Sequence, residues 1–246
     1  MIVLCSAGHS PGVTVSGLAL TLAWPRRILF AECDPAGGQV LSGYLVGQPR
    51  GRGLAEWAVQ LRRGVDPQQA LRTQILLLSD VESRAVLAGL AEPAQLSSVE
   101  PLWPSVAQTF AGISDDVIVD LGRVGGSDTA LPILNRADQV LMVTRPNLPE
   151  LAAAAPRLKK IKELRGPLPG PRILLTGRGP YSRKEVARTL DTEVAAHLPY
   201  DPRVAAVLSH GTGNPRNIGR SLLIRAARSV AGGLLAYAER DEVPTP

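Results

Sequence analysis

The sequence predicts an α/β protein in which a mostly parallel, doubly wound sheet of about seven to eight strands carries helices on both faces, as a three-layer sandwich. Short apolar runs alternate with longer segments of helical periodicity along the whole chain, which is typical of parallel βαβ units. The first apolar run also passes through a glycine-containing loop directly into a helical pattern. With 246 residues and 45% hydrophobic content, the chain can form one large domain. We expect this domain over residues 1–240 and a flexible tail at 241–246.

The order of elements follows from the same alternation. The expected strands are the short apolar runs at residues 2–5, 27–31, 74–78, 117–120, 139–144, 172–176 and 194–198. The expected helices lie at residues 12–23, 54–63, 97–111, 128–135, 149–164, 183–190 and 202–209, with a last one from 218 to about 240. That last helix is predicted to pack against the sheet, and a membrane-surface helix with a basic face is the alternative.

Composition indicates a cytoplasmic protein that is at most peripheral to a membrane or the nucleoid. The net charge is +5 and the pI about 9.6, which favours nucleic acid, anionic lipid or an acidic partner, although an arginine-rich composition can also reflect a GC-rich genome. The cysteines, Cys5 and Cys33, are too few for a disulfide framework and are expected to be reduced and buried. No segment approaches the roughly 18 to 20 apolar residues of a membrane span.

The loop after the first strand has most features of a phosphate-binding loop. A strand, a glycine-containing loop and a helix start point backbone N–H groups and the positive end of the helix dipole at a phosphate. Such a loop also uses a lysine directly after its last glycine and a hydroxyl next to it. Gly12 and Thr14 are present here, but Val13 takes the place of the lysine.

This loop resembles the deviant Walker A motif, K-G-G-x-G-K-T-T, of the MinD and ParA ATPases. The resemblance places Gly8 where the family has its signature lysine, which reaches across the dimer, so both lysines are missing. It implies a P-loop NTPase fold, of the Rossmann-like type, and nucleotide contacts from the whole loop. The residues concerned are Gly8, His9, Ser10, Pro11, Gly12, Val13, Thr14 and Val15.

Further segments resemble the same family in order and at suitable distances, over roughly residues 1–235. The segment 28–38 is similar to the D-x-D-P-x-G motif, with Glu32 replacing the first aspartate and Asp34 retained, which implies a vestigial water-positioning role for Asp34. The strand ending at Asp120 is similar to a Walker B strand. The resemblance therefore implies that Thr14, Glu32 and Asp120 would hold Mg²⁺, if it binds.

The base-binding end of the site is implied by two further segments. The segment 135–146 is similar to the family's "ADxVLVVTxP" strand, and 198–203 is similar to its "IPYDP" segment, which adds Pro199 and Asp201 to the expected nucleotide contacts. The family commonly has an asparagine that reads adenine at the end of its sixth strand, whereas residues 175–180 here contain no Asn or Asp, and Arg178 of this segment is an expected nucleotide contact. Arg123, Arg145, Arg178 and Arg203 all follow expected strand ends, and we hypothesise that one of them substitutes for a missing lysine.

The loss of both lysines favours a pseudo-ATPase over an enzyme, because phosphoryl transfer depends on cations that match the developing charge. Binding of ATP or ADP with Mg²⁺ is expected to be weak or absent. The resemblance implies a homodimeric positioning or scaffold factor, in pilus or secretion localisation, septum placement or DNA partition, with an unidentified protein partner. A slow ATPase that dimerises with ATP and uses a substitute arginine is one alternative. A partition accessory that binds DNA without sequence preference is another, and an anionic membrane surface is a further contact to consider.

Overall fold

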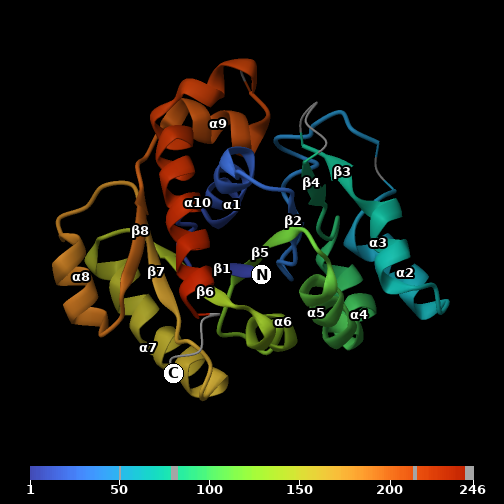
Figure 1. Ribbon diagram of the computed structural model, residues 1–246, viewed down its shortest axis with the longest axis horizontal. Coiled ribbons are helices and arrows are strands. Elements are labelled where there is room, and N and C mark those ends of the chain that lie inside the picture. The colour runs from blue at the N-terminus through green and yellow to red at the C-terminus, as the bar shows by residue number, and fades with distance from the viewer. Residues whose placement is uncertain (50, 79–82, 213–214, 242–246) are drawn as a thin grey trace.

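The centre of the computed structural model is an eight-stranded sheet with the strand order β3-β4-β2-β5-β1-β6-β7-β8 (Figure 1). The structure describes residues 1–49, 51–78, 83–212 and 215–241. Most of the expected tail, residues 242–246, therefore lies outside the described residues. Every neighbouring pair of strands is parallel except β3 with β4. The predicted fold class is confirmed.

The strands follow the predicted apolar runs closely, with one exception. They are β1 (Ile2–Ser6), β2 (Ile28–Glu32), β3 (Leu76–Leu77), β4 (Arg84–Leu87), β5 (Asp116–Arg123), β6 (Gln139–Thr144), β7 (Arg172–Thr176) and β8 (Val194–Leu198). The strand predicted at 74–78 is wrong at its start, because Gln74 ends a helix and only two residues form an antiparallel edge strand. The inner position beside β2 belongs to β4, which was not predicted.

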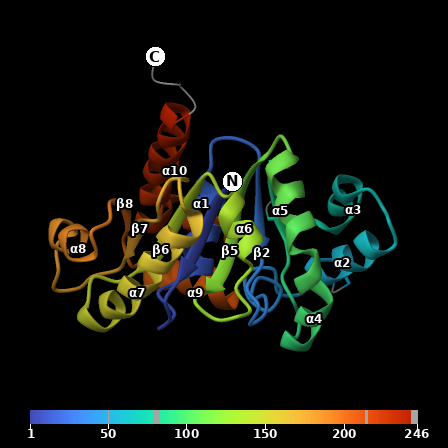
Figure 2. The same cartoon turned by 90° about the horizontal axis from the view of Figure 1, so that it is seen from below.

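The helices form two layers around two hydrophobic cores. One core lies between the sheet and α1 (Val13–Ala23), α9 (Pro202–His210) and α10 (Leu222–Asp241). The other lies between the sheet and α2 (Leu54–Arg62), α3 (Pro67–Gln74), α4 (Leu96–Val99), α5 (Trp103–Gly112), α6 (Leu131–Arg136), α7 (Leu148–Arg165) and α8 (Arg183–Leu190). Short 3-10 turns are found at η1 (Pro93–Gln95), η2 (Glu100–Leu102) and η3 (Pro215–Arg220). Figure 2 shows the strands from the side of α6 and α7, which lie in front of them.

Alternation along the strands explains why the sheet is buried on both faces. In β1, Val3 and Cys5 belong to one core, whereas Ile2 and Leu4 belong to the other. Successive side chains of a strand point to opposite faces, so a central parallel strand is apolar throughout. Cys5 and Cys33 are free and buried, as predicted.

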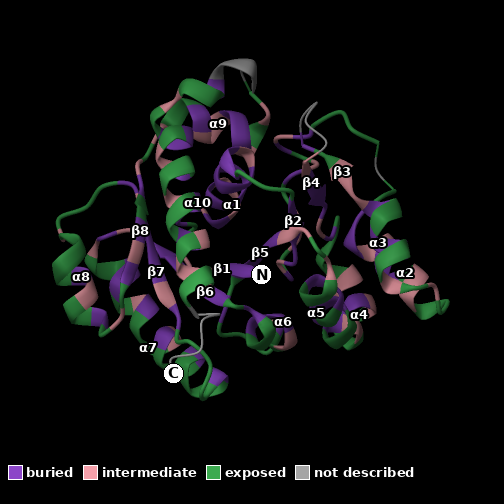
Figure 3. Ribbon diagram, viewed as in Figure 1, coloured by how far each residue is buried: buried purple, intermediate pink, exposed green. Residues whose placement is uncertain are grey.

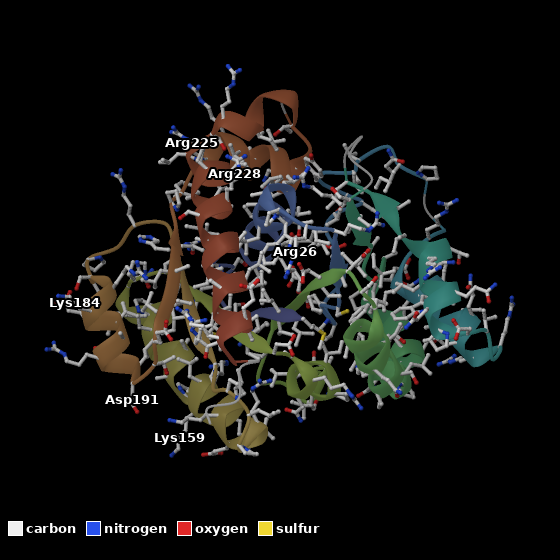
Figure 4. All side chains as sticks on the ribbon, in the orientation of Figure 1. Arg26, Lys159, Lys184, Asp191, Arg225 and Arg228 are labelled. Atoms are coloured by element: carbon white, nitrogen blue, oxygen red, sulfur yellow. The ribbon has the colours of Figure 1, made fainter. Side chains whose placement is uncertain are left out.

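The last helix packs inward, as predicted. α10 lies beside α1 (Figure 1) and buries Leu223, Ala227 and Leu234. Figure 3 shows much of the visible side of α10 as exposed. Arg225 and Arg228 are exposed residues of this helix, and Figure 4 labels both. The apolar side that a membrane-surface helix would need is therefore used in the core. None of the helices in the described part of the chain has the length and hydrophobicity required for a membrane span.

The close approach of α1 to the sheet requires glycine at one position. A Cβ placed on Gly17 would lie 2.3 Å from Cε2 of Phe30 in β2. The helix that starts at the glycine-rich loop can therefore lie directly on the neighbouring strand. This contact fixes where the N-terminus of α1 meets the carboxyl edge of the sheet.

Candidate functional site

The loop between β1 and α1 is held in an unusual backbone conformation. His9 and Ser10 have φ of 61° and 48°, in the left-handed region, and Gly8 and Gly12 have φ of 140° and 97°. Left-handed backbone is uncommon for residues other than glycine and persists where its surroundings hold it. Two side chains from distant strands do so: Thr176 Oγ1 donates to the Pro11 carbonyl at 2.9 Å, and Arg145 Nη2 donates to the Ser10 carbonyl at 3.0 Å.

The first turn of α1 has backbone donors available for an anion. Gly12 is the N-cap residue and provides no side-chain cap, so the N–H groups of Val13, Thr14 and Val15 have no partner within the helix. The positive end of the helix dipole lies at the same place. Val13 itself is only 8% exposed and packs in the core under the loop. An anion at the helix start would therefore meet backbone N–H groups of α1 and not the Val13 side chain.

Thr14 and Asp120, two of the predicted magnesium ligands, are in contact beside this helix start. Thr14 Oγ1 donates to Asp120 Oδ2 at 2.6 Å, and the Gly122 N–H donates to Asp120 Oδ1 at 2.7 Å. Burial raises the pKa of Asp120 to about 7, although both hydrogen bonds lower it, and the nearby Glu32 and Asp34 carboxylates raise it further. A hydroxyl and a buried carboxyl at this spacing are a donor pair suited to Mg²⁺.

Glu32 has a different role from the predicted one. Its Oε1 accepts from the N–H groups of Gln39 and Val40 at 2.6 and 3.0 Å, and its Oε2 accepts from Gly89 N–H at 3.0 Å. Burial raises the pKa of Glu32, and these three backbone bonds oppose that effect. Oε1 thus holds the loop that follows β2, and Oε2 holds the segment that follows β4. Because both oxygens are used in this way, and Glu32 does not line the cavity described below, we retain Thr14 and Asp120 alone for the metal.

Asp34 lies at the carboxyl end of β2 and faces the site. Its Oδ1 accepts from Ala36 N–H at 2.8 Å, and burial raises its pKa. A Cβ on Gly122 would lie 1.9 Å from Asp34 Oδ2, and Gly122 has φ of 60°. Only glycine at position 122 therefore allows Asp34 to approach the end of β5.

A cavity of about 1020 Å³ opens at this edge of the sheet. This is at the upper end of the usual range for small-molecule sites. It is lined by Asp34, Asp120, Arg178, Pro199, Asp201 and the whole loop from Gly8 to Val15, so all predicted site residues except Glu32 meet here. Asp201 also caps α9, since its Oδ1 accepts from Val204 N–H at 3.2 Å.

Several lining residues were not predicted. Tyr200, 67% exposed, lies beside the predicted Pro199 and Asp201. Gln39, Thr176, Ser209 and Leu223 come from the loop after β2 and from β7, α9 and α10. The strand-end position of Thr176 was a usable signal. For Ser209 and Leu223, which lie within helices, the sequence offers no such signal.

The positively charged side chains around the loop are arginines. Arg123, Arg145 and Arg178 line the cavity, whereas Arg203 does not. β5 and β6 flank β1 in the sheet, so Arg123, at the end of β5, and Arg145, directly after β6, lie on opposite sides of the loop. Among the residues that the structure describes, which include all four lysines, none of the cavity lining is a lysine. The four lysines are on α7 and α8, at Lys159, Lys160, Lys162 and Lys184, and Figure 4 shows Lys159 and Lys184 at the outer margin of the molecule.

Comparisons with known proteins show where this architecture recurs. Compared by sequence, the chain matches no protein-family model and no curated protein. Compared by structure, it is similar to a ParA family ATPase from Chlorobium tepidum TLS, with a TM-score of 0.77, 20% identity, and coverage of 93% of this chain and 98% of the other. The septum site-determining protein MinD from Pyrococcus horikoshii OT3, complexed with Mg-ADP, gives a TM-score of 0.76 and 16% identity over 98% of each chain.

A third similar structure is a putative plasmid partition protein from Borrelia burgdorferi B31 bound to AMPPNP, with a TM-score of 0.72 and 13% identity over 96% of this chain and 98% of the other. All three likenesses extend over nearly the whole chain, although the sequences have diverged widely. The chain has the fold of the MinD and ParA ATPases.

Proposed function

We propose that this chain is a nucleotide-binding positioning or partition protein that hydrolyses ATP weakly or not at all. The observation that carries the proposal is the cavity at the loop, in which free backbone N–H groups of α1 and the Thr14–Asp120 pair face the same space. Phosphates bind at the helix start, Mg²⁺ binds at Thr14 and Asp120, and the base lies toward Pro199 and Asp201. Figure 1 shows α1, which begins at this loop, at the centre of the molecule.

The similar structures support the ligand class and the cellular role. One is a septum site-determining protein with Mg-ADP, and another is a putative plasmid partition protein with AMPPNP. A homodimer and a protein partner belong to the same proposal, and a MinC:MinD complex from Aquifex aeolicus is also similar in structure.

Weak or absent hydrolysis follows from the side chains at the two lysine positions. Val13 is buried and uncharged, and Gly8 has no side chain. Loss of a cation that stabilises the transition state of phosphoryl transfer lowers the rate by factors of about 10³ or more. Binding is affected less, because one charge-assisted hydrogen bond contributes about 1.5–3 kcal/mol.

The test is calorimetric titration with Mg-ADP and Mg-ATP, with light scattering on the same samples. We expect saturable binding of the wild-type protein and about tenfold weaker binding of the Thr14→Ala variant in the presence of Mg²⁺. The matched control is Thr212→Ala, an exposed threonine that does not line the cavity. Absence of binding at about 1 mM nucleotide would contradict the proposal and would direct the search to protein partners that use this face.

A slow ATPase is the second candidate, because Arg123 and Arg145 bring two cations to the loop. Phosphate release measured over hours, together with ATP-dependent dimerisation, distinguishes this candidate from the first. Release that is abolished in both the Arg123→Ala and Arg145→Ala variants would favour it. Phosphate release no faster than in buffer alone would support the first candidate, a protein that binds nucleotide without hydrolysing it.

A further inference from the structure

The three arginines of the cavity differ in what already binds them. The Arg145 guanidinium is engaged, since Nη1 donates to Glu150 Oε1 at 3.2 Å and Nη2 donates to the Ser10 carbonyl at 3.0 Å. Glu150 is itself buried and also accepts from the Arg145 N–H at 2.7 Å. Arg145 therefore connects α7 to the loop through these hydrogen bonds. Within residues 1–49, 51–78, 83–212 and 215–241, neither Arg123 nor Arg178 has a side-chain hydrogen bond or ion pair.

Arg123 and Arg178 differ in how far they lie from the loop between β1 and α1. Arg178 follows β7, which is separated from β1 by β6, and the Gly177 before it lies near Tyr200 at the other end of the cavity. Arg123 ends β5, which pairs directly with β1, and Ser6 and Arg123 are partners in that register. Since neighbouring strands are about 4.8 Å apart, Arg123 is within side-chain reach of the loop, and Arg178 starts one strand farther away.

The Arg123 side chain lies against the first glycine of the loop. A Cβ placed on Gly8 would lie 3.6 Å from Arg123 Nε and 3.8 Å from Arg123 Cζ. With φ of 140° at Gly8, a residue with a side chain would be strained there. The loop therefore carries no cation of its own at this position, and a cation from β5 occupies the adjacent space.

We infer that Arg123 is the side chain that binds the terminal phosphates of the nucleotide, and that it does so in the same protomer whose loop holds the nucleotide. This inference rests on the proposed function, because it names the main phosphate contact of that site. A guanidinium with uncommitted donors can bind a phosphate through two parallel hydrogen bonds. Arg123 lines the same cavity as the first turn of α1, so a phosphate bound there would be contacted by both.

Two consequences distinguish this contact from a general electrostatic effect. The contribution of Arg123 applies only to ligands that carry a phosphate chain, so adenosine does not depend on it. Because the cation and the loop belong to one protomer, the loss of affinity caused by removing Arg123 is the same whether the protein is monomeric or dimeric.

The experiment compares pyrophosphate, ADP and adenosine as probes of the wild-type, Arg123→Ala and Arg123→Lys proteins, by calorimetry at several salt concentrations. The matched control is Arg225→Ala, an exposed arginine on the outer side of α10 (Figure 4). We expect Arg123→Ala to bind pyrophosphate and ADP about ten- to a hundredfold more weakly, with partial recovery in Arg123→Lys and unchanged weak binding of adenosine. Thermal unfolding confirms that the variants are folded.

Wild-type affinity in Arg123→Ala, alongside clear binding by the wild type, would overturn this inference and leave the proposed function intact. A larger loss for pyrophosphate in Arg145→Ala than in Arg123→Ala would move the contact to Arg145 and overturn it as well. A loss of affinity in Arg123→Ala that is seen only at protein concentrations where the wild type dimerises would overturn the assignment to one protomer. Failure of the wild type to bind either ADP or pyrophosphate would overturn the proposed function together with the inference.

Discussion

Replacing Asp120 by asparagine is expected to stabilise the metal-free protein at neutral and alkaline pH. Asp120 is 2% exposed, and burial raises its pKa from 3.8 to about 7. Between those values the folded state keeps a proton that the unfolded state has released, so the free energy of unfolding falls as pH rises. Because each pKa unit corresponds to about 1.4 kcal/mol, full ionisation of Asp120 lowers the unfolding free energy by on the order of 4 kcal/mol.

Asparagine removes this loss while keeping the local hydrogen bonds. Its amide oxygen can accept from the Gly122 N–H, and its amide group can donate to Thr14 Oγ1, in place of the bonds that Asp120 makes. Burial also raises the pKa values of Glu32 and Asp34, so these two groups make the unfolding free energy of both wild type and variant fall as pH rises. The informative quantity is therefore the difference between variant and wild type.

The assay is urea denaturation with a metal chelator at a series of pH values between about 4 and 9. The stability advantage of Asp120→Asn should be close to zero at the acidic end, should grow through pH 5 and 6, and should level off above about pH 7. An advantage that is constant across the series, or that is largest at acidic pH, would refute the reasoning that buried Asp120 holds a proton.

Other predictions concern packing and buried polar groups. Gly17→Ala should lower the unfolding free energy by about 1–3 kcal/mol, because its Cβ would lie 2.3 Å from Phe30. Gly232→Ala, at an open position of α10, should raise it by about 0.5–1 kcal/mol. In chemical denaturation, a stabilised Gly17→Ala variant would contradict the first prediction, and a destabilised Gly232→Ala variant would contradict the second. Arg165→Ala should lower it by about 3 kcal/mol or more, because the buried guanidinium donates to three backbone carbonyls. A loss below about 1 kcal/mol by the same assay would show that water replaces those bonds.

At the β3–β4 edge of the sheet, the sequence indicated which residues are apolar but not which strand pairs with β2. Residues 75–78 are more continuously apolar than residues 84–87, yet the latter segment pairs with β2. An apolar pattern indicates which side chains are buried. Which strand takes the inner position beside β2 depends on contacts with residues far away in the sequence. α3 is mostly polar and was missed, although Asp66 followed by Pro67 is a recognisable helix start.

The site was predictable where a motif is local in sequence. The loop and Asp34 follow strands, Asp120 lies in β5 at the end of its predicted apolar run, and parallel strands bring their carboxyl ends to one edge. The role of Glu32 was not predictable, because one of its three backbone partners is 57 residues away. The contacts of Arg145 with Ser10 and of Thr176 with Pro11 likewise join residues 135 and 165 positions apart. Such bonds depend on the packed fold, which a pattern in one segment does not encode.

The lysine-free cavity has a practical consequence for chemical surveys of nucleotide-binding proteins. Reagents that transfer an acyl group from a nucleotide to a neighbouring amine label a lysine beside the phosphates, because a guanidinium remains protonated and is a poor nucleophile. Here the cavity offers arginines, and the four lysines are on α7 and α8. Under the proposed function, this protein would bind such a reagent without presenting an amine to it at the phosphates, so an amine-directed probe would leave the site unlabelled.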